Sequence, residues 1–308
     1  MQWSIDVGPN LWGSRTLAVM PGGDVVLGVC SKPFCFSQDG SAVTAAIVRI
    51  SSAGKTLWTT RVPGTGFSSI DADGRGRTLA VVDAPDAPRI VLVGDAGGIL
   101  LDAATDIAFP RASLGGESGD FVVAGQEAAT GKPVFERRRS DGGTRFRATL
   151  DVARGAVDRV SFAPNGSIAL GGWFEGRLQW GGEAHDAQFG SGFVVVGGGD
   201  GSPQWSKADT GLSGSSASVP PCVAFGRDND VVTFTQTFGK GQANLRSYTR
   251  DGAQRWIHEF GGIFGTWVNA VAVARNGDVV VGGNGTADAP FKALPFAKTT
   301  QYVAVIAP

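Results

Sequence analysis

Apolar and polar positions alternate along most of the chain in short runs that are bounded by Gly, Asp and Asn. The run Gly277–Gly283, GDVVVGG, and the run before it, Trp267–Gly277, show this pattern. Alternation with a period of two places one face of an extended strand in a core, and the bounding residues favour tight turns. The pattern therefore predicts short antiparallel strands joined by hairpins, with almost no room for helices.

A strand led by an aromatic or large apolar residue recurs about every 50 residues, and three strand-like runs precede it each time. Four strands repeated six times are typical of an all-β, six-bladed β-propeller with four-stranded antiparallel blades. The second and third periods fit this template least well, so five or seven blades remain open, with seven as the second choice. We take as equivalent the leading residues Trp3, Trp58, Leu100, Phe146, Trp205 and Trp256.

The two chain ends predict how the blades close into a ring. Gln2–Gly8 lacks three strands before it, and Gln301–Pro308 lacks a strand after it. Pairing the two in one blade completes the last period and covers strand edges. We expect a single propeller domain over residues 1–308, with blades near 9–64, 65–106, 107–155, 156–211, 212–261, and 262–308 together with 1–8.

Several stretches resemble a known bacterial repeat. Val271–Phe291, VAVARNGDVVVGGNGTADAPF, is similar to the SBBP-type β-propeller repeat, in which an alternating strand, a Gly-Asn or Gly-Asp turn and an aliphatic strand follow one another. Gly166–Gly182 and Gly192–Gly211 resemble the variant found in secreted or surface proteins of myxobacteria and their relatives. The resemblance is clear in periods one, four, five and six, and it implies a secreted or cell-surface bacterial module without naming an activity.

Composition and charge narrow the class further. Glycine accounts for 47 of 308 residues, and 27 Lys and Arg oppose 28 Asp and Glu. This balance predicts no general attraction to nucleic acid or to an anionic membrane, and no segment has the ~20 apolar residues that span a bilayer. Strand-like residues begin at Gln2, so the sequence shows no signal peptide. The protein is either intracellular or trimmed, and the resemblance favours trimming and a secreted or surface location.

Three cysteines are too few for a disulfide scaffold. Cys30 and Cys35 lie close together in CSKPFC, where either a local disulfide or two free thiols can occur. A disulfide would indicate an oxidising compartment. Cys222, in an apolar run, is expected to be a buried free thiol.

Residues able to support catalysis are scarce. The only histidines are His185 and His258, no Gly-x-Ser-x-Gly or His-Glu-x-x-His motif occurs, and no pattern requires a metal or a cofactor. His185, in a long connection, is the better candidate for a general base, although a structural role is favoured for both. Asp71-Ala-Asp73-Gly74 resembles the start of a calcium loop, but the later ligands are missing, which favours a plain turn.

Paired turn residues recur at one hairpin of the predicted blades. A ring of carboxylates around a channel is one interpretation, but their repetition favours turn chemistry, in which Gly or Asn takes a positive φ and Asp caps local backbone groups. The pairs are Gly23-Asp24, Gly119-Asp120, Asn229-Asp230 and Gly277-Asp278.

Aromatic residues gather in the connections expected at one mouth of the ring, where insertions also concentrate. With neighbouring polar groups they would suit a sugar or a peptide, and packing inside the channel is the alternative. The repeated strand tryptophans also resemble positions in quinone-dependent dehydrogenase propellers, but packing between blades explains them more simply. The expected ligand-binding residues are Trp12, Arg15, Phe67, Trp173, Trp180 and Trp267.

One hairpin concentrates positive charge. Its arginines can form a patch for an anionic polymer or an acidic protein, or an ordinary solvated edge that discourages strand pairing. The arginines are Arg137, Arg138, Arg139, Arg145 and Arg147.

These observations predict a non-catalytic ligand- or protein-binding propeller of a secreted or cell-surface bacterial protein, with its binding face at the loop-rich mouth. A lyase or hydrolase that uses His185 is the first alternative, and a structural part of a larger assembly is the second. The expected partner is a protein or a carbohydrate, and the oligomeric state is left open.

Overall fold

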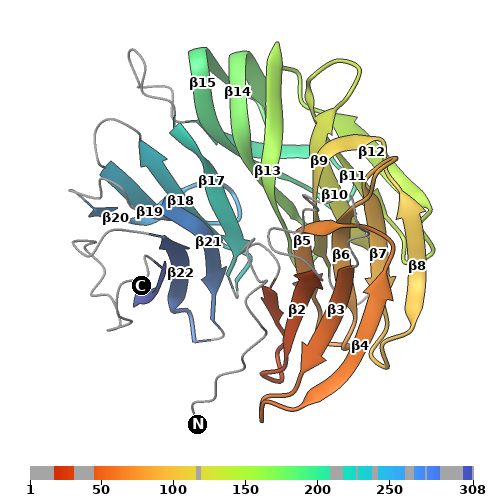
Figure 1. Cartoon of the computed structure of the whole chain (residues 1–308). Coiled ribbons are helices and arrows are strands. Elements are labelled where there is room, and N and C mark those ends of the chain that lie inside the picture. Colours follow the sequence, from red (N-terminus) through yellow and green to blue (C-terminus); the bar gives the residue numbers. More distant parts are fainter. Residues whose placement is uncertain are drawn as a thin grey trace. The chain divides into compact units, whose positions relative to one another are not determined.

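The computed structural model describes residues 17–30, 45–115, 119–208, 218–226, 228–237, 242–260, 267–274, 276–284 and 301–306. Regular structure in these ranges is entirely β-strand, so none of them holds a helix able to cross a membrane. The strands form six antiparallel sheets, each made of consecutive strands (Figure 1). The prediction of an all-β chain with the six blades of a β-propeller is therefore confirmed.

The chain comprises two compact units, one of residues Met1–Ala128 with Glu136–Phe146 and the other of Ala129–Phe135 with Arg147–Pro308. Blades 1 and 2 belong to the first unit. Blade 1 contains β1 (Leu17–Val19), β2 (Val25–Cys30), β3 (Ala45–Ile50) and β4 (Thr56–Val62). Blade 2 contains β5 (Gly66–Ala72), β6 (Thr78–Asp83), β7 (Arg89–Val93) and β8 (Ile99–Ala104).

Blade 3 corresponds to the third period of the sequence. It is also a four-stranded sheet, and it holds residues of both units. Its strands are β9 (Ile107–Leu114), β10 (Phe121–Glu127), β11 (Pro133–Arg138) and β12 (Thr144–Thr149).

Blades 4 to 6 belong to the second unit. Blade 4 contains β13 (Arg154–Phe162), β14 (Ile168–Trp180), β15 (Glu183–Gly197) and β16 (Pro203–Ala208). Blade 5 contains β17 (Ser218–Phe225), β18 (Val231–Thr237), β19 (Gln242–Tyr248) and β20 (Gln254–Phe260). The described strands of blade 6 are β21 (Trp267–Val273), β22 (Val279–Asn284) and β23 (Gln301–Ile306). Gln2–Gly8 lies outside the described residues, so its pairing with β23 stays a prediction.

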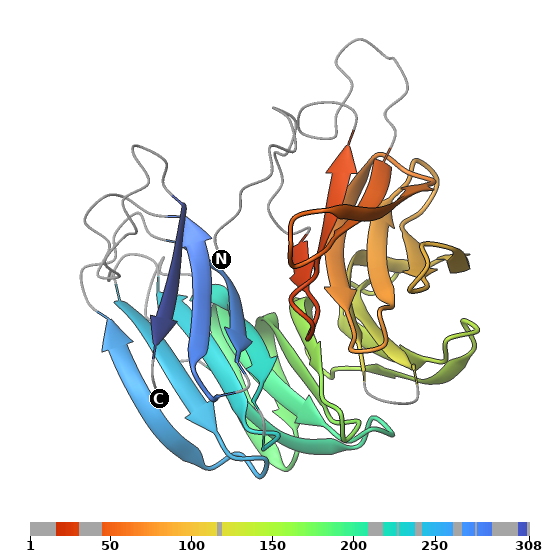
Figure 2. The ribbon, with the colours of Figure 1, turned by 90° about the horizontal axis from the view of Figure 1, so that it is seen from below.

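Within each unit, successive blades pack face to face. β1 and β2 contact β5, and β5 and β6 contact β9, while in the second unit β13 to β15 contact β17, and β17 and β18 contact β21. Figure 2 shows the sheets of blades 4, 5 and 6 following one another in this way. Buried apolar side chains of neighbouring blades form shared clusters, such as Val26 and Ile47 of blade 1 with Ala80 and Val91 of blade 2. Each blade thus depends on its neighbour for burial.

The turn between the first and second strands contains the predicted glycine or asparagine in a left-handed conformation. Such residues accept a positive φ at little steric cost. The φ angles are 86° at Gly23, 76° at Gly119, 60° at Asn229 and 94° at Gly277. The structure therefore confirms the turn chemistry of these positions.

Asp278 bonds with Asn276 of its own turn, whereas the other aspartates of these turns act over a longer range than the sequence predicted. Asp24 accepts a hydrogen bond from Ser52 N in the next turn of its blade (3.0 Å) and pairs with Arg49 of β3 (2.8 Å). Asp230 pairs with Arg255 of β20 at 2.8 Å. Each of these two aspartates thus ties the first turn of its blade to the third or fourth strand, and does not simply cap its own turn.

The leading aromatic residue of the fourth strand packs on the next blade. Trp58 Nε1 donates to Asp95 O of blade 2 (2.8 Å), and Trp205 Nε1 donates to Arg250 O of blade 5 (2.9 Å). The indole of Trp58 lies on Gly97, where an added Cβ would come within 3.0 Å of its Cγ. Packing between blades is therefore confirmed for Trp58 and Trp205.

In blade 2 the equivalent residue is Leu101, and the prediction of Leu100 is wrong by one position. Leu101 pairs with Leu92 as Trp58 pairs with Arg49. A Cβ added at Gly142 of the next blade would lie 3.0 Å from Leu101 Cδ1, whereas Leu100 is 60% exposed. Leu100 and Leu101 are adjacent, and the strand register shifts next to the Leu92–Leu101 pair. Alternation of apolar and polar positions alone therefore could not show which leucine faces the next blade.

We expect Leu101→Ala to lower the free energy of unfolding by about 1–2 kcal/mol, because it removes a half-buried contact with the next blade. Leu100→Ala, the control with the same chemistry, should change it by less than about 0.5 kcal/mol. Urea unfolding of the two variants measures this. A larger effect at Leu100 would contradict the register.

Candidate functional site

The first strands of five blades contain a β-bulge at corresponding positions. In β5, β9, β13, β17 and β21 the first strand has one residue more than its partner between two flanking pairs. Bulges twist a strand and re-aim side chains, and they are frequent beside functional sites. The bulged residues are Ser68, Phe109-Pro110, Asp158, Pro220-Pro221 and Asn269.

Phe109 is the most exposed aromatic residue among those described. Its ring is 71% exposed, and its φ of 51° is left-handed, which is unusual for a residue with a Cβ. The bulge in β9 holds this conformation. Strained, exposed aromatic residues of this kind point to a binding role.

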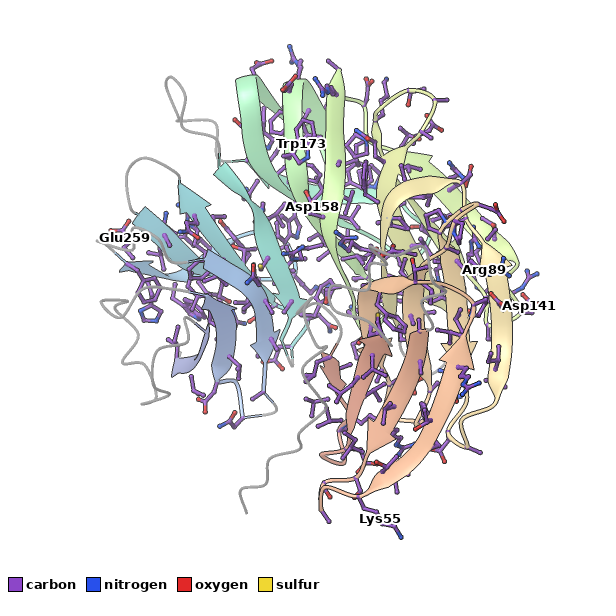
Figure 3. All side chains as sticks on the ribbon, viewed as in Figure 1. Lys55, Arg89, Asp141, Asp158, Trp173 and Glu259 are labelled. Carbon is purple, nitrogen blue, oxygen red and sulfur yellow. The ribbon has the colours of Figure 1, made fainter. Side chains whose placement is uncertain are left out.

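A cluster of polar and aromatic side chains surrounds the bulges of β13 and β21, and we name it the β13 cluster. It contains Arg154, Asp158, Arg159, Trp173 and Asn269. Arg159 donates to Asp158 O at 2.7 Å and to Asn269 O at 3.2 Å, which links two first strands. The Arg154 guanidinium lies over the half-buried Trp173 ring, 5.8 Å from its centroid. Figure 3 shows Trp173 on β14 and Asp158 on the neighbouring β13.

The β13 cluster combines an aromatic face, two guanidinium groups and backbone carbonyls. Such a surface can stack on an apolar or sugar ring while it donates hydrogen bonds to a polar backbone. It contains Trp173, which the sequence predicted, and Arg154 and Arg159, which it missed.

The other predicted ligand-binding residues are placed differently. Trp12 and Arg15 lie outside the described residues, and Trp267 begins β21 without a described side chain. Phe67 packs between blades 1 and 2, since a Cβ added at Gly28 would lie 2.7 Å from its ring. Packing, the alternative interpretation, fits Phe67 better than an open binding surface.

Trp180 is also a packing residue. It is 7% exposed, its Nε1 donates to Val196 O at 2.8 Å, and its ring meets Phe135 edge to face at 5.9 Å. The long connection predicted around His185 is not a loop, because β14 and β15 continue through it as an antiparallel hairpin with one register irregularity. The hairpin thus places Trp180 between its own blade and Phe135 of β11 in blade 3.

The two histidines have different surroundings. His185 Nε2 lies 3.0 Å from Ser206 Oγ, which in turn donates to Trp180 O. When the hydroxyl donates its single proton to Trp180 O, Nε2 is the donor to that hydroxyl and does not act as its base. The same Nε2 lies 3.6 Å from Glu183 Oε2. Ser206 is fully buried. His258 lies on β20, the fourth strand of blade 5, with its ring beside Trp256.

The arginine hairpin is largely paired within itself. Asp120, which is 2% exposed, receives both Arg137 and Arg145 at 2.6 Å. Arg138 pairs with Glu136. Arg139 pairs with Asp141 at 3.2 Å, and a hydrogen bond from Gly143 N, assisted by Arg139, holds the pKa of Asp141 below its usual range. The exposed arginines are Arg139, Arg145 and Arg147. The anionic-partner patch stays a prediction, with fewer unpaired charges than expected.

The sequence that resembled a calcium loop is a turn. Asp73 accepts hydrogen bonds from Arg75 N and Arg77 N at 3.0 Å each and pairs with the Arg77 side chain. Asp71 accepts bonds from Ser113 Oγ (2.8 Å) and Leu114 N (2.9 Å) of β9, and so joins two first strands. Burial raises the pKa of Asp71, although these hydrogen bonds oppose the rise. In the part of the chain described, no three metal-binding side chains gather.

The cysteines divide into two kinds. Cys222 is a buried free thiol, as predicted. Cys30, which ends β2 and is buried, is disulfide-bonded. Cys35 lies outside the described residues, so the Cys30–Cys35 pairing stays a prediction.

Comparisons with known proteins show the fold alone. No family model matches the chain, and no curated protein matches its sequence. The RRP9 WD40 repeats align over 94% of this chain and 78% of theirs, with a TM-score of 0.59 and 12% identity. U3-55K aligns over 95% and 80%, with a TM-score of 0.57 and 11% identity. Hydrazine synthase of Kuenenia stuttgartiensis aligns over 96% and 95%, with a TM-score of 0.57 and 11% identity. These β-propellers confirm a propeller repeat protein.

Asp71 gives a pH dependence with a definite sign. Because its folded pKa lies above the unfolded value, its stabilising contribution is complete in acid and is lost as pH rises above about 4 through the folded pKa. Urea unfolding from pH 4 to 7 should show wild type losing stability relative to Asp71→Asn as pH rises. Asp141→Asn, at an exposed carboxylate with a lowered pKa, is the control, and wild type should gain slightly on it over the same rise. A gain relative to Asp71→Asn as pH rises would contradict the raised pKa.

The cysteine assignment is tested by alkylation. In denaturant without reductant, a thiol reagent should add one label, at Cys222, because Cys30 is bonded. After reduction two more labels should appear, and peptide mapping of the unreduced protein should recover Cys30 linked to Cys35. Three labels without reduction would contradict the disulfide.

Proposed function

We propose that this protein is a non-catalytic propeller module that binds a peptide segment of a partner protein. The observation that carries the proposal is the β13 cluster, in which the bulges of β13 and β21 present Asp158 and Asn269, and Arg154 lies over the Trp173 ring. Regular strands would bury alternate residues, and a bulge frees the extra one for contact.

A peptide fits this chemistry well. Arg154 and Trp173 offer a cation and a ring face, and the first-strand carbonyls and side chains offer polar partners for a backbone. Sugars can use the same ring face, so a carbohydrate is the second ligand class, which the experiment below distinguishes. The propeller fold, shared with WD40 repeat proteins, supports protein binding in general.

The proposal also covers the cellular context. The bonded Cys30 supports an oxidising compartment. Together with the resemblance to the SBBP-type repeat, this favours a secreted or cell-surface bacterial protein, with the loop-rich mouth as the binding face. Exposure of the module outside the cell would give a peptide partner direct access.

The test begins with peptide and glycan arrays, followed by affinity measurements on the hits. We expect a peptide hit that Arg154→Gln weakens about tenfold, since this variant removes the exposed guanidinium that lies over the Trp173 ring. Arg177→Gln, an exposed arginine on the neighbouring β14, is the matched control and should bind like wild type.

Three outcomes would overturn the proposal. Glycan hits alone would replace the peptide with a carbohydrate, and hits insensitive to Arg154→Gln would move the binding face elsewhere. Silence on the arrays, together with turnover in a hydrolase or lyase panel that His185→Ala abolishes, would establish an enzyme.

A further inference from the structure

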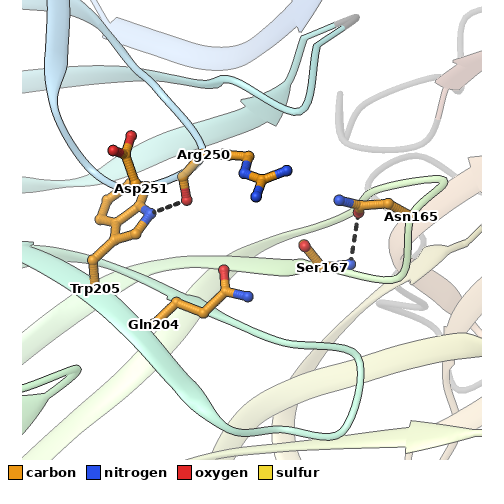
Figure 4. Close-up of a pocket in the computed structure, with 6 residues that line it drawn as sticks. All are labelled: Asn165, Ser167, Gln204, Trp205, Arg250 and Asp251. Atoms are coloured by element: carbon orange, nitrogen blue, oxygen red, sulfur yellow. Dashed lines mark hydrogen bonds between the residues drawn. The ribbon is translucent and has the colours of Figure 1, made fainter.

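A hollow lies between blades 4 and 5, at the opposite end of β13 from Arg154. It has a volume of about 530 Å³, within the range of small-ligand sites. The turn that follows β13, the start of β16 and the turn between β19 and β20 form its walls. Its lining residues are Asn165, Ser167, Gln204, Trp205, Arg250 and Asp251 (Figure 4).

The corresponding place between blades 1 and 2 is filled. There Arg49, which pairs across the strands with Trp58, contacts both Asp24 of its own blade and Asp95 of the next. This arginine is half-buried and bridges the two turns. The seam between blades 1 and 2 is thus closed by one cation between two carboxylates.

Strand register and turn geometry identify the equivalents in blades 4 and 5. Val196 pairs with Trp205 and so replaces Arg49. Ser167 follows Gly166 (φ 91°) as Asp24 follows Gly23 (φ 86°), and Ser167 therefore replaces Asp24. Arg250 accepts the indole hydrogen bond of Trp205, as Asp95 accepts that of Trp58. The contact between blades 4 and 5 therefore has neither the cation nor the two carboxylates found between blades 1 and 2. An arginine, Arg250, occupies the position of one carboxylate.

The polar groups of the hollow face one another. Figure 4 shows the Arg250 guanidinium, the Gln204 amide, Ser167 and Asn165 directed toward a common space. Asn165 Oδ1 accepts a bond from Ser167 N (2.9 Å), which leaves its amide nitrogen as a donor. Asp251 turns away and accepts the Thr249 hydroxyl. Within the described ranges, Arg250 forms no ion pair.

We propose that this hollow binds the carboxylate of a small ligand or peptide. A guanidinium presents parallel donors that match a carboxylate in a bidentate pair, and Gln204, Asn165 and Ser167 add neutral donors. One cation balances one carboxylate, whereas a phosphate dianion would leave charge uncompensated beside Asp251. The site is separate from the β13 cluster and does not depend on the proposed function.

The experiment follows the Trp205 indole NH signal by NMR, because that group bonds to the backbone of Arg250. The probes are N-acetyl-alanine, with a terminal carboxylate, and N-acetyl-aspartate N-methylamide, with a side-chain carboxylate. Their neutral controls are N-acetyl-alanine amide and N-acetyl-asparagine N-methylamide, and inorganic phosphate serves as a second anion. All titrations are made at constant ionic strength.

We expect at least one carboxylate probe to shift the Trp205 signal, and the responding probe tells whether a chain terminus or an acidic side chain is preferred. Arg250→Gln should weaken binding about tenfold or more. Ser167→Asp, which restores the residue found in blade 1, should block the site by pairing with Arg250 while the Tm holds or rises. Arg75→Gln, at an exposed arginine in the first turn of blade 2, is the control and should leave binding unchanged.

The absence of any shift, equal binding of the neutral amides, or binding of phosphate alone would each overturn the proposal. An equal loss in Arg75→Gln would do so as well, because it would show general charge attraction. Failure here leaves the peptide-array result untouched, so the two proposals stand or fall separately.

Discussion

Burial of two apolar faces per sheet is the constraint on which this structure depends. A four-stranded blade cannot cover both faces by itself, so each blade needs a neighbour. The contact is made close by a large side chain on the fourth strand that rests on a left-handed glycine of the next blade. Trp58 on Gly97 and Trp205 on Gly252 have this geometry, and a Cβ at either glycine would collide with the ring or nearly so. The glycine content of the chain thus follows from packing as much as from turns.

The same constraint explains why the polar and charged side chains between neighbouring blades can differ from one pair of blades to the next while the fold stays the same. The tryptophan and glycine fix the distance between two blades, and neighbouring positions only have to fill or line the remaining space. Arg49 fills that space with a bridge between two carboxylates in one seam. Val196 leaves it open in another, where Arg250 takes the place of a carboxylate. A repeat fold therefore provides an internal comparison in which one seam shows what its equivalent lacks.

The sequence predicts the blades well because their determinants are local. Alternation and positive-φ residues such as Gly23 and Asn229 act within a few positions, and both have a clear pattern. Features that depend on partners distant in sequence were missed. Three such features depend on how strands pair with one another. They are the ion pairs of Asp120 with two arginines, the packing of Trp180, and the contact of Leu101 instead of Leu100 with the next blade. The bulges left only a weak signal, the prolines in β9 and β17, because Asp158 and Asn269 resemble ordinary strand residues.

Functional groups in this chain concentrate where packing relaxes. The middle of β13 belongs to the core through residues such as Val157, whereas Arg154 at its start is exposed and Ser161 near its end lines a pocket. At its beginning, Arg154 stands over Trp173, and beyond its end Asn165 and Ser167 face Arg250. His185, by contrast, is fixed between a buried serine and its own hairpin. A catalytic base needs a reactive partner and access to substrate. The hydroxyl beside His185, that of Ser206, is buried, whereas both ends of β13 have accessible donors, which recognition of a ligand requires.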